Sequence, residues 1–172
     1  MPPTRTANSN LIVIRGNAAS GKSSTAQGIR DRYGRGIAIV GQDSIRRNIL
    51  REQDMAGAAN IELIDMTARF ALDHGYHVIV EGVLYAAHYG EMLTQLVHDH
   101  RGQSRCYYFD VSFDETLRRH LTRPAALDFG EKEMRQWYRP QDYVPSLNEW
   151  QISEDVPFTE AIDLIWRHET LD

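Results

Sequence analysis

The run LIVIRGNAASGKSST at residues 11–25 decides the fold, because a short apolar segment leads directly into a glycine-rich loop. The loop fits the pattern G-x-x-x-x-G-K-[ST] at Gly16, Gly21, Lys22 and Ser23. Glycines let the backbone turn its N–H groups toward an anion, and a helix beginning at Lys22 adds the positive end of its dipole. The stretch therefore predicts a phosphate-binding loop between a buried strand and a helix.

The loop pattern also predicts what is bound. A lysine at this position bridges the β- and γ-phosphates of a nucleotide, and the hydroxyl that follows it holds Mg²⁺. We expect ATP, with GTP as the alternative nucleotide, and Mg²⁺ as cofactors. The residues expected to bind the nucleotide are Gly16, Asn17, Ala18, Ala19, Ser20, Gly21, Lys22, Ser23 and Ser24. The alternative is a turn that only joins strand to helix, and the flanking apolar strand and helix favour the phosphate loop.

Composition sets the broad class of the protein. The chain has 172 residues, of which 42% are apolar and 25% charged, and this is typical of one globular domain. We expect a disordered segment at 1–9 and a single domain at 10–172. A net charge of -5 argues against a nucleic-acid partner, and no apolar run is long enough for a membrane span. The lone Cys106 cannot form an intrachain disulfide, so a cytoplasmic location is expected, while the oligomeric state is left open.

Strand-like and helix-like segments alternate along the chain. Expected strands after the first are 37–40, 76–83, 105–112 and 149–153. Four helices are expected at 23–33, 45–50, 131–138 and 158–168, the last with Pro157 at its first position. Three more are expected: one that begins at 60 and ends before 75, one that ends at 102, and one that begins at 113. Such alternation predicts an α/β fold with a parallel sheet that helices cover on both faces, and with ligands beyond the C-terminal ends of the strands.

Four segments together resemble the small P-loop kinases, a group that includes chloramphenicol phosphotransferase, zeta toxins and the kinase domain of polynucleotide kinase. The segments are GNAASGKSS (16–24), DSIR (43–46), VIVEG (78–82) and FDETLRRHLTRP (113–124). The resemblance implies a P-loop NTPase three-layer sandwich with a five-stranded parallel sheet of order 2-3-1-4-5 and a lid. It also implies transfer of the γ-phosphoryl group of ATP to a hydroxyl.

The resemblance assigns catalytic roles to four residues: Lys22, Asp43, Arg119 and Arg123. Asp43 is similar in placement to the carboxylate that takes the proton of the acceptor hydroxyl, although an Asp before Ser44 also suits a helix N-cap. Arg119 and Arg123 are four residues apart, so both would lie on one helix face and close over the triphosphate. The alternative is that these arginines are solvated surface charges. The lid is expected at about 118–143.

Other residues are candidates for the metal and the acceptor. Ser23 and Glu81 are the expected magnesium ligands, with Glu81 acting through water, and its alternative is a simple ion pair. For the acceptor, the candidates are Asp43, Arg46, Tyr85 and Trp137. Arg46 would bind an acidic or phosphorylated group, and the two aromatic rings would stack on a ring of the acceptor. Surface exposure of Arg46 and simple packing of the rings are the alternatives.

The sequence thus predicts an ATP-dependent O-phosphotransferase that acts on a small-molecule hydroxyl, with a nucleoside or an antibiotic as candidate acceptors. The antibiotic would imply a role in antibiotic resistance. The alternative enzymes are kinases of a polynucleotide 5′-hydroxyl or of a nucleotide sugar. An alternative of another class is a switch that binds a partner in its nucleotide-bound form without transferring phosphate.

Overall fold

The structure, a computed structural model, describes residues 3–4, 6–169 and 171 of the chain. The strands are β1 (Asn10–Gly16), β2 (Ile37–Gly41), β3 (His77–Gly82), β4 (Gln103–Asp110) and β5 (Trp150–Ser153). The α-helices are α1 (Lys22–Tyr33), α2 (Ala59–Asp73), α3 (Ala86–Asp99), α4 (Phe113–His120), α5 (Glu131–Trp137) and α6 (Phe158–Glu169). Shorter helical segments are the π-helix η1 (Ser44–Ile49) and the 3₁₀ turns η2 (Pro124–Leu127) and η3 (Pro145–Leu147).

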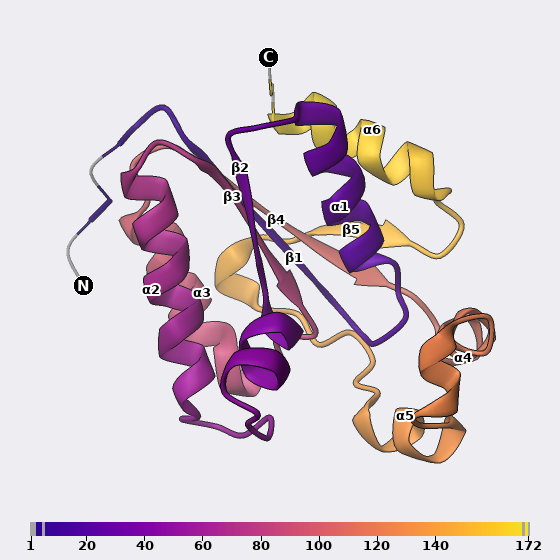
Figure 1. Ribbon diagram of the computed structural model, residues 1–172. Helices are drawn as coiled ribbons and strands as arrows, with labels where there is room; N and C mark the ends of the chain where they lie inside the picture. Colours follow the sequence, from indigo (N-terminus) through magenta and orange to yellow (C-terminus); the bar gives the residue numbers. More distant parts are fainter. Residues whose placement is uncertain (1–2, 5, 170, 172) are drawn as a thin grey trace.

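The five strands pair in the order β2-β3-β1-β4-β5, and every pairing is parallel. This confirms the predicted order. The central strand β1 is hydrogen-bonded on both sides, with Leu11 beside Val78 of β3 and Gly16 beside Phe109 of β4. Because parallel strands end at the same edge, the segments that follow β1, β2 and β3 meet there (Figure 1).

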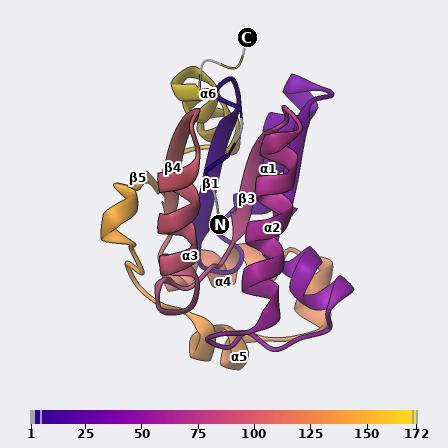
Figure 2. The same ribbon diagram turned by 90° about the vertical axis from the view of Figure 1, so that its left-hand side faces the viewer.

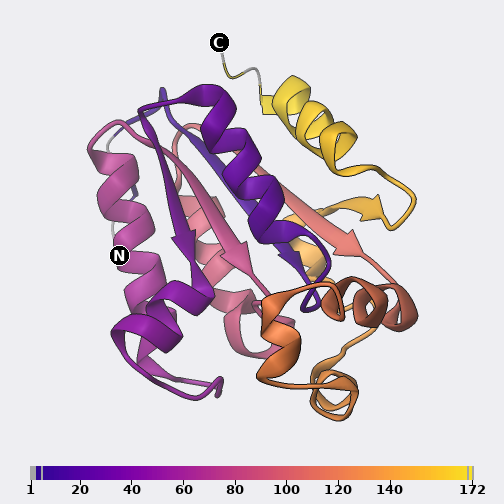
Figure 3. The same cartoon turned by 45° about the vertical axis from the view of Figure 1, so that its right-hand side comes forward.

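Helices cover both faces of the sheet and complete a three-layer sandwich. Leu11 and Val13 of β1 pack toward α2 and α3, whereas Ile12 and Ile14 pack toward α1 and α6. Figures 2 and 3 show these two helical layers on opposite sides of the strands. Alternate residues of a strand point to opposite faces, so a strand buried on both faces needs a continuous apolar run. The run LIVI supplies it.

The N-terminal segment is attached to the rest of the domain. The hydroxyl of Thr6 donates to the carbonyl of Leu72 at 2.7 Å, and Ser9 Oγ lies 3.0 Å from His100 Nε2. Thr4 and Ser9 are both buried. This differs from the disordered segment predicted for residues 1–9, of which residues 1, 2 and 5 lie outside the described residues. The hydroxyl groups of this segment form hydrogen bonds with a backbone carbonyl and a histidine, and composition alone does not predict such contacts.

Segment 118–143, the expected lid, lies beyond the C-terminal ends of the strands and contains η2 and α5 (Figure 3). At the other end of the chain, Pro157 lies one position before the first residue of α6 and acts as its N-cap. Its carbonyl accepts the first helical hydrogen bond, from the amide of Ala161 at 2.9 Å. Within the described residues, no helix is long and apolar enough to cross a membrane.

Arg15 is a buried charge at the end of β1. Its guanidinium donates to Glu149 Oε1 at 2.8 Å, to Asp142 Oδ2 at 3.1 Å and to the carbonyl of Leu84 at 2.9 Å. The Arg15 side chain is 0% exposed and that of Glu149 only 2%. Arg15 therefore joins the strand before the phosphate loop to the segment after β3, to the end of segment 118–143 through Asp142, and to the chain beyond it through Glu149.

Replacing Arg15 with methionine is expected to lower the free energy of unfolding by about 3–5 kcal/mol, because Glu149 would be left as an unpaired buried charge. Urea denaturation followed by circular dichroism measures this change. The matched control is Arg118→Met, since the Arg118 side chain is 69% exposed and its loss should cost less than about 1 kcal/mol. Equal losses in the two variants would contradict the role given to Arg15.

Candidate functional site

The glycine-rich loop has the backbone geometry that the pattern requires. Gly16 has a φ of 147°, and a Cβ at this position would lie 2.8 Å from the carbonyl oxygen of Phe109. Gly21 has a φ of 106° and precedes α1, so it also uses a conformation that favours glycine. The loop between them therefore turns tightly at the end of β1 and directs its backbone toward the N-terminus of α1.

A cleft of about 830 Å³ opens beside this loop. Its wall includes the loop and Ser23, the segment after β2, the C-terminal end of β3, the start of α3, and parts of the chain from α4 to Asp142. Of the nucleotide residues predicted from sequence, Asn17, Ala18, Ala19, Lys22 and Ser23 line the cleft. Gly16, Ser20 and Gly21 form the backbone turn behind it, and Ser24 is exposed on the first turn of α1 outside the lining.

Lys22 is held inside the loop. Its Nζ donates to the carbonyl of Asn17 at 2.6 Å and to Ser20 Oγ at 3.1 Å. Burial lowers the pKa of Lys22 to about 8, although the negative charges of Glu81 and Asp43 act in the opposite direction. Nearby negative charges thus only partly offset the cost of burying the Lys22 ammonium group, and a phosphate anion in the loop would stabilise its charged form.

The depressed pKa of Lys22 predicts a pH-dependent nucleotide affinity. Below about pH 8 the Lys22 side chain is protonated and attracts phosphate. Above about pH 8 the free protein has a neutral Lys22, which must take up a proton when the nucleotide binds. Nucleotide affinity therefore falls by up to about tenfold per pH unit in this range. Calorimetric titration with a non-hydrolysable ATP analogue between pH 7 and pH 9.5 measures this. The Lys22→Arg variant stays charged and should show no such slope. A constant dissociation constant for the original protein would contradict the prediction.

Ser23 and Glu81 lie side by side at the edge of the loop. The Ser23 hydroxyl donates to Glu81 Oε2 at 2.9 Å, and Glu81 is the penultimate residue of β3. Burial raises the pKa of Glu81, and the hydrogen bond from Ser23 and the charge of Lys22 partly oppose this effect. Hard oxygen donors beside a phosphate loop fit Mg²⁺, which is bound in such sites by one or two side chains, phosphate oxygens and water. Ser23 and Glu81, the two magnesium ligands predicted from sequence, therefore lie in direct contact.

Asp43 lies at the end of β2 on the same edge of the sheet. Its Oδ1 pairs with Arg46 at 3.0 Å and with Arg47 at 3.1 Å, and its side chain is 65% exposed. Although Asp43 precedes η1, its carboxylate makes no capping hydrogen bond, so the N-cap alternative has no support in the geometry. The carboxylate is near enough to Lys22 to affect its pKa. Arg46 lines the cleft with most of its side chain buried, contrary to the surface alternative.

Arg119 and Arg123 do not share a helix face, contrary to the sequence prediction. Helix α4 ends at His120, and Arg123 is extended with φ -105° and ψ 150°. The reason is Pro124, because proline excludes the helical conformation from the residue before it. Arg119 donates to Glu115 Oε1 at 2.6 Å and to the phosphate-loop carbonyl of Ser20 at 3.0 Å. It therefore supports the loop from outside.

Arg123 is the arginine of this pair that faces the cleft. It is exposed, lines the cleft, and its charge contributes to lowering the pKa of Lys22. Among the described residues, its guanidinium has no hydrogen-bonding or ion-pair partner. A free cation beside the loop lysine is placed to neutralise phosphate charge.

The role expected for Arg123 at a transferring phosphoryl group predicts that Arg123→Ala lowers kcat on the order of tenfold with a smaller change in nucleotide affinity, because an exposed charge is screened by solvent. Steady-state kinetics and analogue binding measure the two quantities. Arg118→Ala is the matched control, since Arg118 is bound to Glu115 on the exposed side of α4 and should leave both unchanged. A larger loss for Arg118 than for Arg123 would contradict the assignment.

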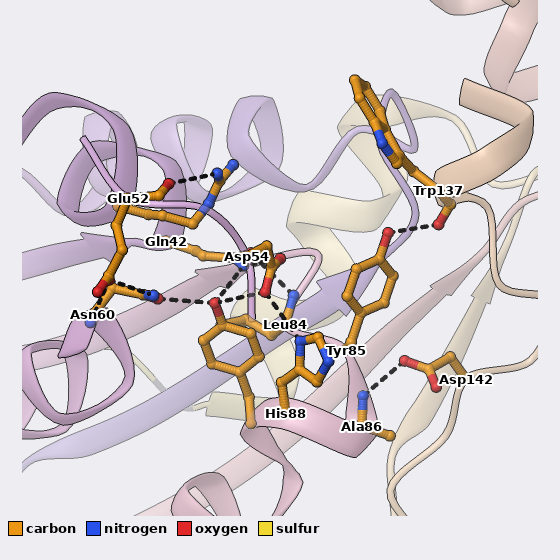
Figure 4. Close-up of polar contacts among 12 residues, drawn as sticks. Gln42, Glu52, Asp54, Asn60, Leu84, Tyr85, Ala86, His88, Trp137 and Asp142 are labelled. Carbon is orange, nitrogen blue, oxygen red and sulfur yellow. Dashed lines mark hydrogen bonds and ion pairs between the residues drawn. The ribbon is translucent and has the colours of Figure 1, made fainter. Parts of the chain in front are cut away.

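The aromatic candidates meet across the cleft. The Tyr85 hydroxyl donates to the carbonyl of Trp137 at 2.6 Å, which joins the start of α3 to the end of α5 (Figure 4). The guanidinium of Arg139 lies 5.5 Å from the centre of the Tyr85 ring, and the His88 ring meets it edge-on at 5.8 Å. The Trp137 ring packs against Phe129 and is 39% exposed. Both rings line the cleft.

Several contacts of the site involve residues that the sequence analysis did not select. The carboxamide of Asn17 accepts from the amide of Arg139 at 2.8 Å and donates to its carbonyl at 2.7 Å, so the phosphate loop holds the end of the lid segment. Arg15 was missed although a charged residue ending an apolar strand is a visible signal. Asp54 and His88, which contact each other at the cleft wall, have no local signal in the sequence.

Solved structures support the assignment of the fold. An APS kinase of Mycobacterium tuberculosis in complex with AMPPNP and APS has a TM-score of 0.70 at 18% identity, over 93% of this chain and 97% of that chain. A sugar kinase of Janibacter has a TM-score of 0.65 at 17% identity, over 92% and 93% of the two chains. A gluconokinase of Sinorhizobium meliloti has a TM-score of 0.60 at 16% identity, over 96% of each chain. At these identities the likeness shows the fold.

Sequence comparison places the site in a family. No curated protein matches the chain at the sequence level. A family model described as an AAA domain matches residues 11–143, which is most of the chain and includes the phosphate loop, Asp43, Glu81 and the arginines of α4 and the segment after it. The sheet order, the loop geometry and the kinase neighbours agree with this match. The chain belongs to the AAA domain family and is a small P-loop kinase in fold.

Proposed function

We propose that the protein transfers the γ-phosphoryl group of ATP to a hydroxyl group of a small molecule. The observation that carries the proposal is that Lys22, Glu81 and Asp43 line one cleft and lie close enough to act on each other's charge. Phosphoryl transfer needs a phosphate cradle, a metal, a positive charge and a carboxylate at the attacking hydroxyl. The cleft contains a residue for each of these roles.

The nucleotide half of the cleft is formed by the loop and α1. The loop amides and Lys22 bind the β- and γ-phosphates, and Arg123 adds a second positive charge. Ser23 and Glu81 would hold Mg²⁺, which neutralises charge on the phosphate oxygens when it is bound. Arg119 keeps the loop in shape through its bond to the carbonyl of Ser20.

Asp43 carries the proton chemistry. The acceptor oxygen attacks the γ-phosphorus, the bond from this phosphorus to the bridging β–γ oxygen breaks, and ADP leaves with the bonding electron pair. The proton of the acceptor hydroxyl passes to the Asp43 carboxylate. Arg46 and Arg47 bind Oδ1 of this group and thereby fix its orientation.

The segment 118–143 acts as a lid in this proposal. Arg123 lies within it, and its far end is fastened to the phosphate loop through Asn17 and to the wall of α3 through Tyr85. Closure over ATP and the acceptor would exclude water that otherwise hydrolyses ATP. The loop, lid and acceptor wall are thus in direct contact.

The acceptor half favours a small polar molecule. A cleft of about 830 Å³ shared with a nucleotide leaves room for a compound of modest size. The acceptor half is lined by equal numbers of positive and negative side chains: Arg46, Arg47 and Arg139, and Asp43, Asp54 and Asp142. Together with the rings of Tyr85 and Trp137, this lining suits a neutral, hydroxyl-bearing compound such as a nucleoside or an antibiotic.

The experiment that tests the proposal is a screen with Mg-ATP and a panel of hydroxyl compounds, including nucleosides, antibiotics, sugars and nucleotide sugars. A product heavier by about 80 Da, which is one phosphoryl group, together with release of ADP, supports transfer. The Lys22→Ala variant is the control for contaminating kinases. If the protein binds nucleotide, modifies no acceptor and binds a protein partner only with ATP, the switch alternative is correct and the proposal is wrong.

A further inference from the structure

A hydrogen-bonded pair, Asp54 and His88, lies in the acceptor half of the cleft. Asp54 belongs to the irregular segment between η1 and α2, and His88 is on the first turn of α3. His88 Nδ1 lies 3.1 Å from Asp54 Oδ1, and the two side chains are 26% and 20% exposed (Figure 4). Both residues line the cleft.

The Asp54 carboxylate is fixed by buried groups that do not involve His88. Gln42 Nε2 donates to its Oδ2 at 2.9 Å, and the Tyr89 hydroxyl lies 3.1 Å from its Oδ1. Gln42 is 2% exposed and Tyr89 0%, so both belong to the protein interior. The Tyr89 hydroxyl also contacts Asn60 Oδ1 at 2.8 Å. The carboxylate is therefore anchored, and His88 is the member of this cluster that reaches the cleft with a free atom.

The contact with Asp54 determines which nitrogen of His88 carries the proton. A carboxylate only accepts hydrogen bonds, so the ring nitrogen that faces it must donate, and the neutral imidazole then has its proton on Nδ1. In this neutral form its Nε2 keeps a lone pair. Among the described residues Nε2 has no hydrogen-bond partner, and Figure 4 shows it pointing away from Asp54. The cleft wall thus presents an oriented hydrogen-bond acceptor.

From this geometry we propose that His88 binds a hydrogen-bond donor of the acceptor molecule, and that Asp54 is the residue that positions it. This inference rests on the proposed function. It defines the substrate class further: the acceptor carries, besides the hydroxyl that is phosphorylated beside Asp43, a second O–H or N–H group that donates to His88 Nε2. Polyols, sugars and amino alcohols meet this condition, whereas simple monohydroxy compounds do not.

The first test is a binding measurement that requires no phosphoryl transfer. The protein with AMPPNP and Mg²⁺, labelled with ¹⁵N at histidine, is titrated with ribose, with ethanolamine and with ethanol, and the His88 nitrogen signals are followed by NMR. Before addition, the signals should show the proton on Nδ1, and Asp54→Ala should remove this preference. Ribose should then shift Nε2, while ethanol should not.

Each outcome of this titration decides the question. A shift with ribose alone assigns a hydroxyl as the second donor, a shift with ethanolamine alone assigns an amine, and a shift with both supports the inference for either group, whereas an equal shift with ethanol contradicts it. If neither compound moves Nε2, or if the free protein has its proton on Nε2, the inference is wrong. Because no transfer occurs with AMPPNP, these results are independent of whether the enzymatic proposal succeeds.

The second test uses any acceptor that the screen identifies. His88→Phe keeps a flat ring against Tyr85 but has no nitrogen, so KM for the acceptor should rise about tenfold to a hundredfold with kcat nearly unchanged. His88→Gln restores an acceptor atom and should recover part of the loss. The effect should vanish for an analogue that lacks the second donor. The same KM change for both compounds would show a merely structural role and overturn the inference.

Discussion

Replacing Lys22 with alanine is expected to reduce phosphoryl transfer at least about a hundredfold. The change removes the positive charge that faces the β- and γ-phosphates, in a buried position where charge is weakly screened. Transfer to an identified acceptor, or ADP release in its presence, measures the loss. Nucleotide affinity should fall as well, because the same charge binds the ground state.

The fold of the Lys22→Ala protein should be retained. The variant loses the hydrogen bonds to Asn17 and Ser20, but it also removes the cost of burying an ammonium group, so the free energy of unfolding should change by only about 1 kcal/mol. Circular dichroism and urea denaturation check this. A folded variant with full transfer would contradict the assignment of the phosphate loop.

The Asp43→Asn variant is expected to lower kcat by about a hundredfold to ten-thousandfold, the range for losing a general base. Asparagine keeps the size of the side chain but cannot take up a proton. The dissociation constant for an ATP analogue should change little, because Asp43 addresses the acceptor hydroxyl. Rapid-quench or steady-state kinetics together with analogue binding separate the two effects.

The free energy of unfolding of the Asp43→Asn variant distinguishes a catalytic role of Asp43 from a structural one. Asp43 makes no capping hydrogen bond and its own side chain is 65% exposed, so the free energy of unfolding should fall by only about 1 kcal/mol. Asp163→Asn is the matched control, since Asp163 of α6 forms an exposed ion pair with Arg32 of α1 and its replacement should leave both kinetics and stability unchanged. Lost stability with unimpaired kcat would instead make Asp43 a structural residue.

Local patterns in the sequence were sufficient to predict the α/β class and the phosphate loop. The apolar run before Gly16 fills both faces of a central strand, and the spacing from Gly16 to Lys22 is a contiguous pattern that predicts the loop. Alternation of strands and helices then fixes a parallel sheet, whose order was predicted from the resemblance to small P-loop kinases. For the same reason Ser23, Asp43 and Glu81 could be placed together, because each follows or ends a strand at one edge.

Helical spacing was a poorer guide near the lid. Arg119 and Arg123 are four residues apart, but Pro124 ends the helical conformation before Arg123, and the two guanidinium groups have different environments. Proline was visible in the sequence, so this error came from applying a helix rule beyond the end of the helix. The contact of Arg119 with the carbonyl of Ser20 joins residues 99 positions apart and has no local signal.

The sequence by itself determined the parallel sheet, the phosphate loop and the edge at which ligands are expected, because these depend on contiguous residues and on the alternation of strands and helices. Only the tertiary structure decided which side chains complete the cleft. Asn17 meets Arg139 across 122 positions, and Asp54 meets His88 across 34. The orientation of such side chains depends on how the loops pack against the sheet, because their hydrogen bonds join segments that are far apart in the chain.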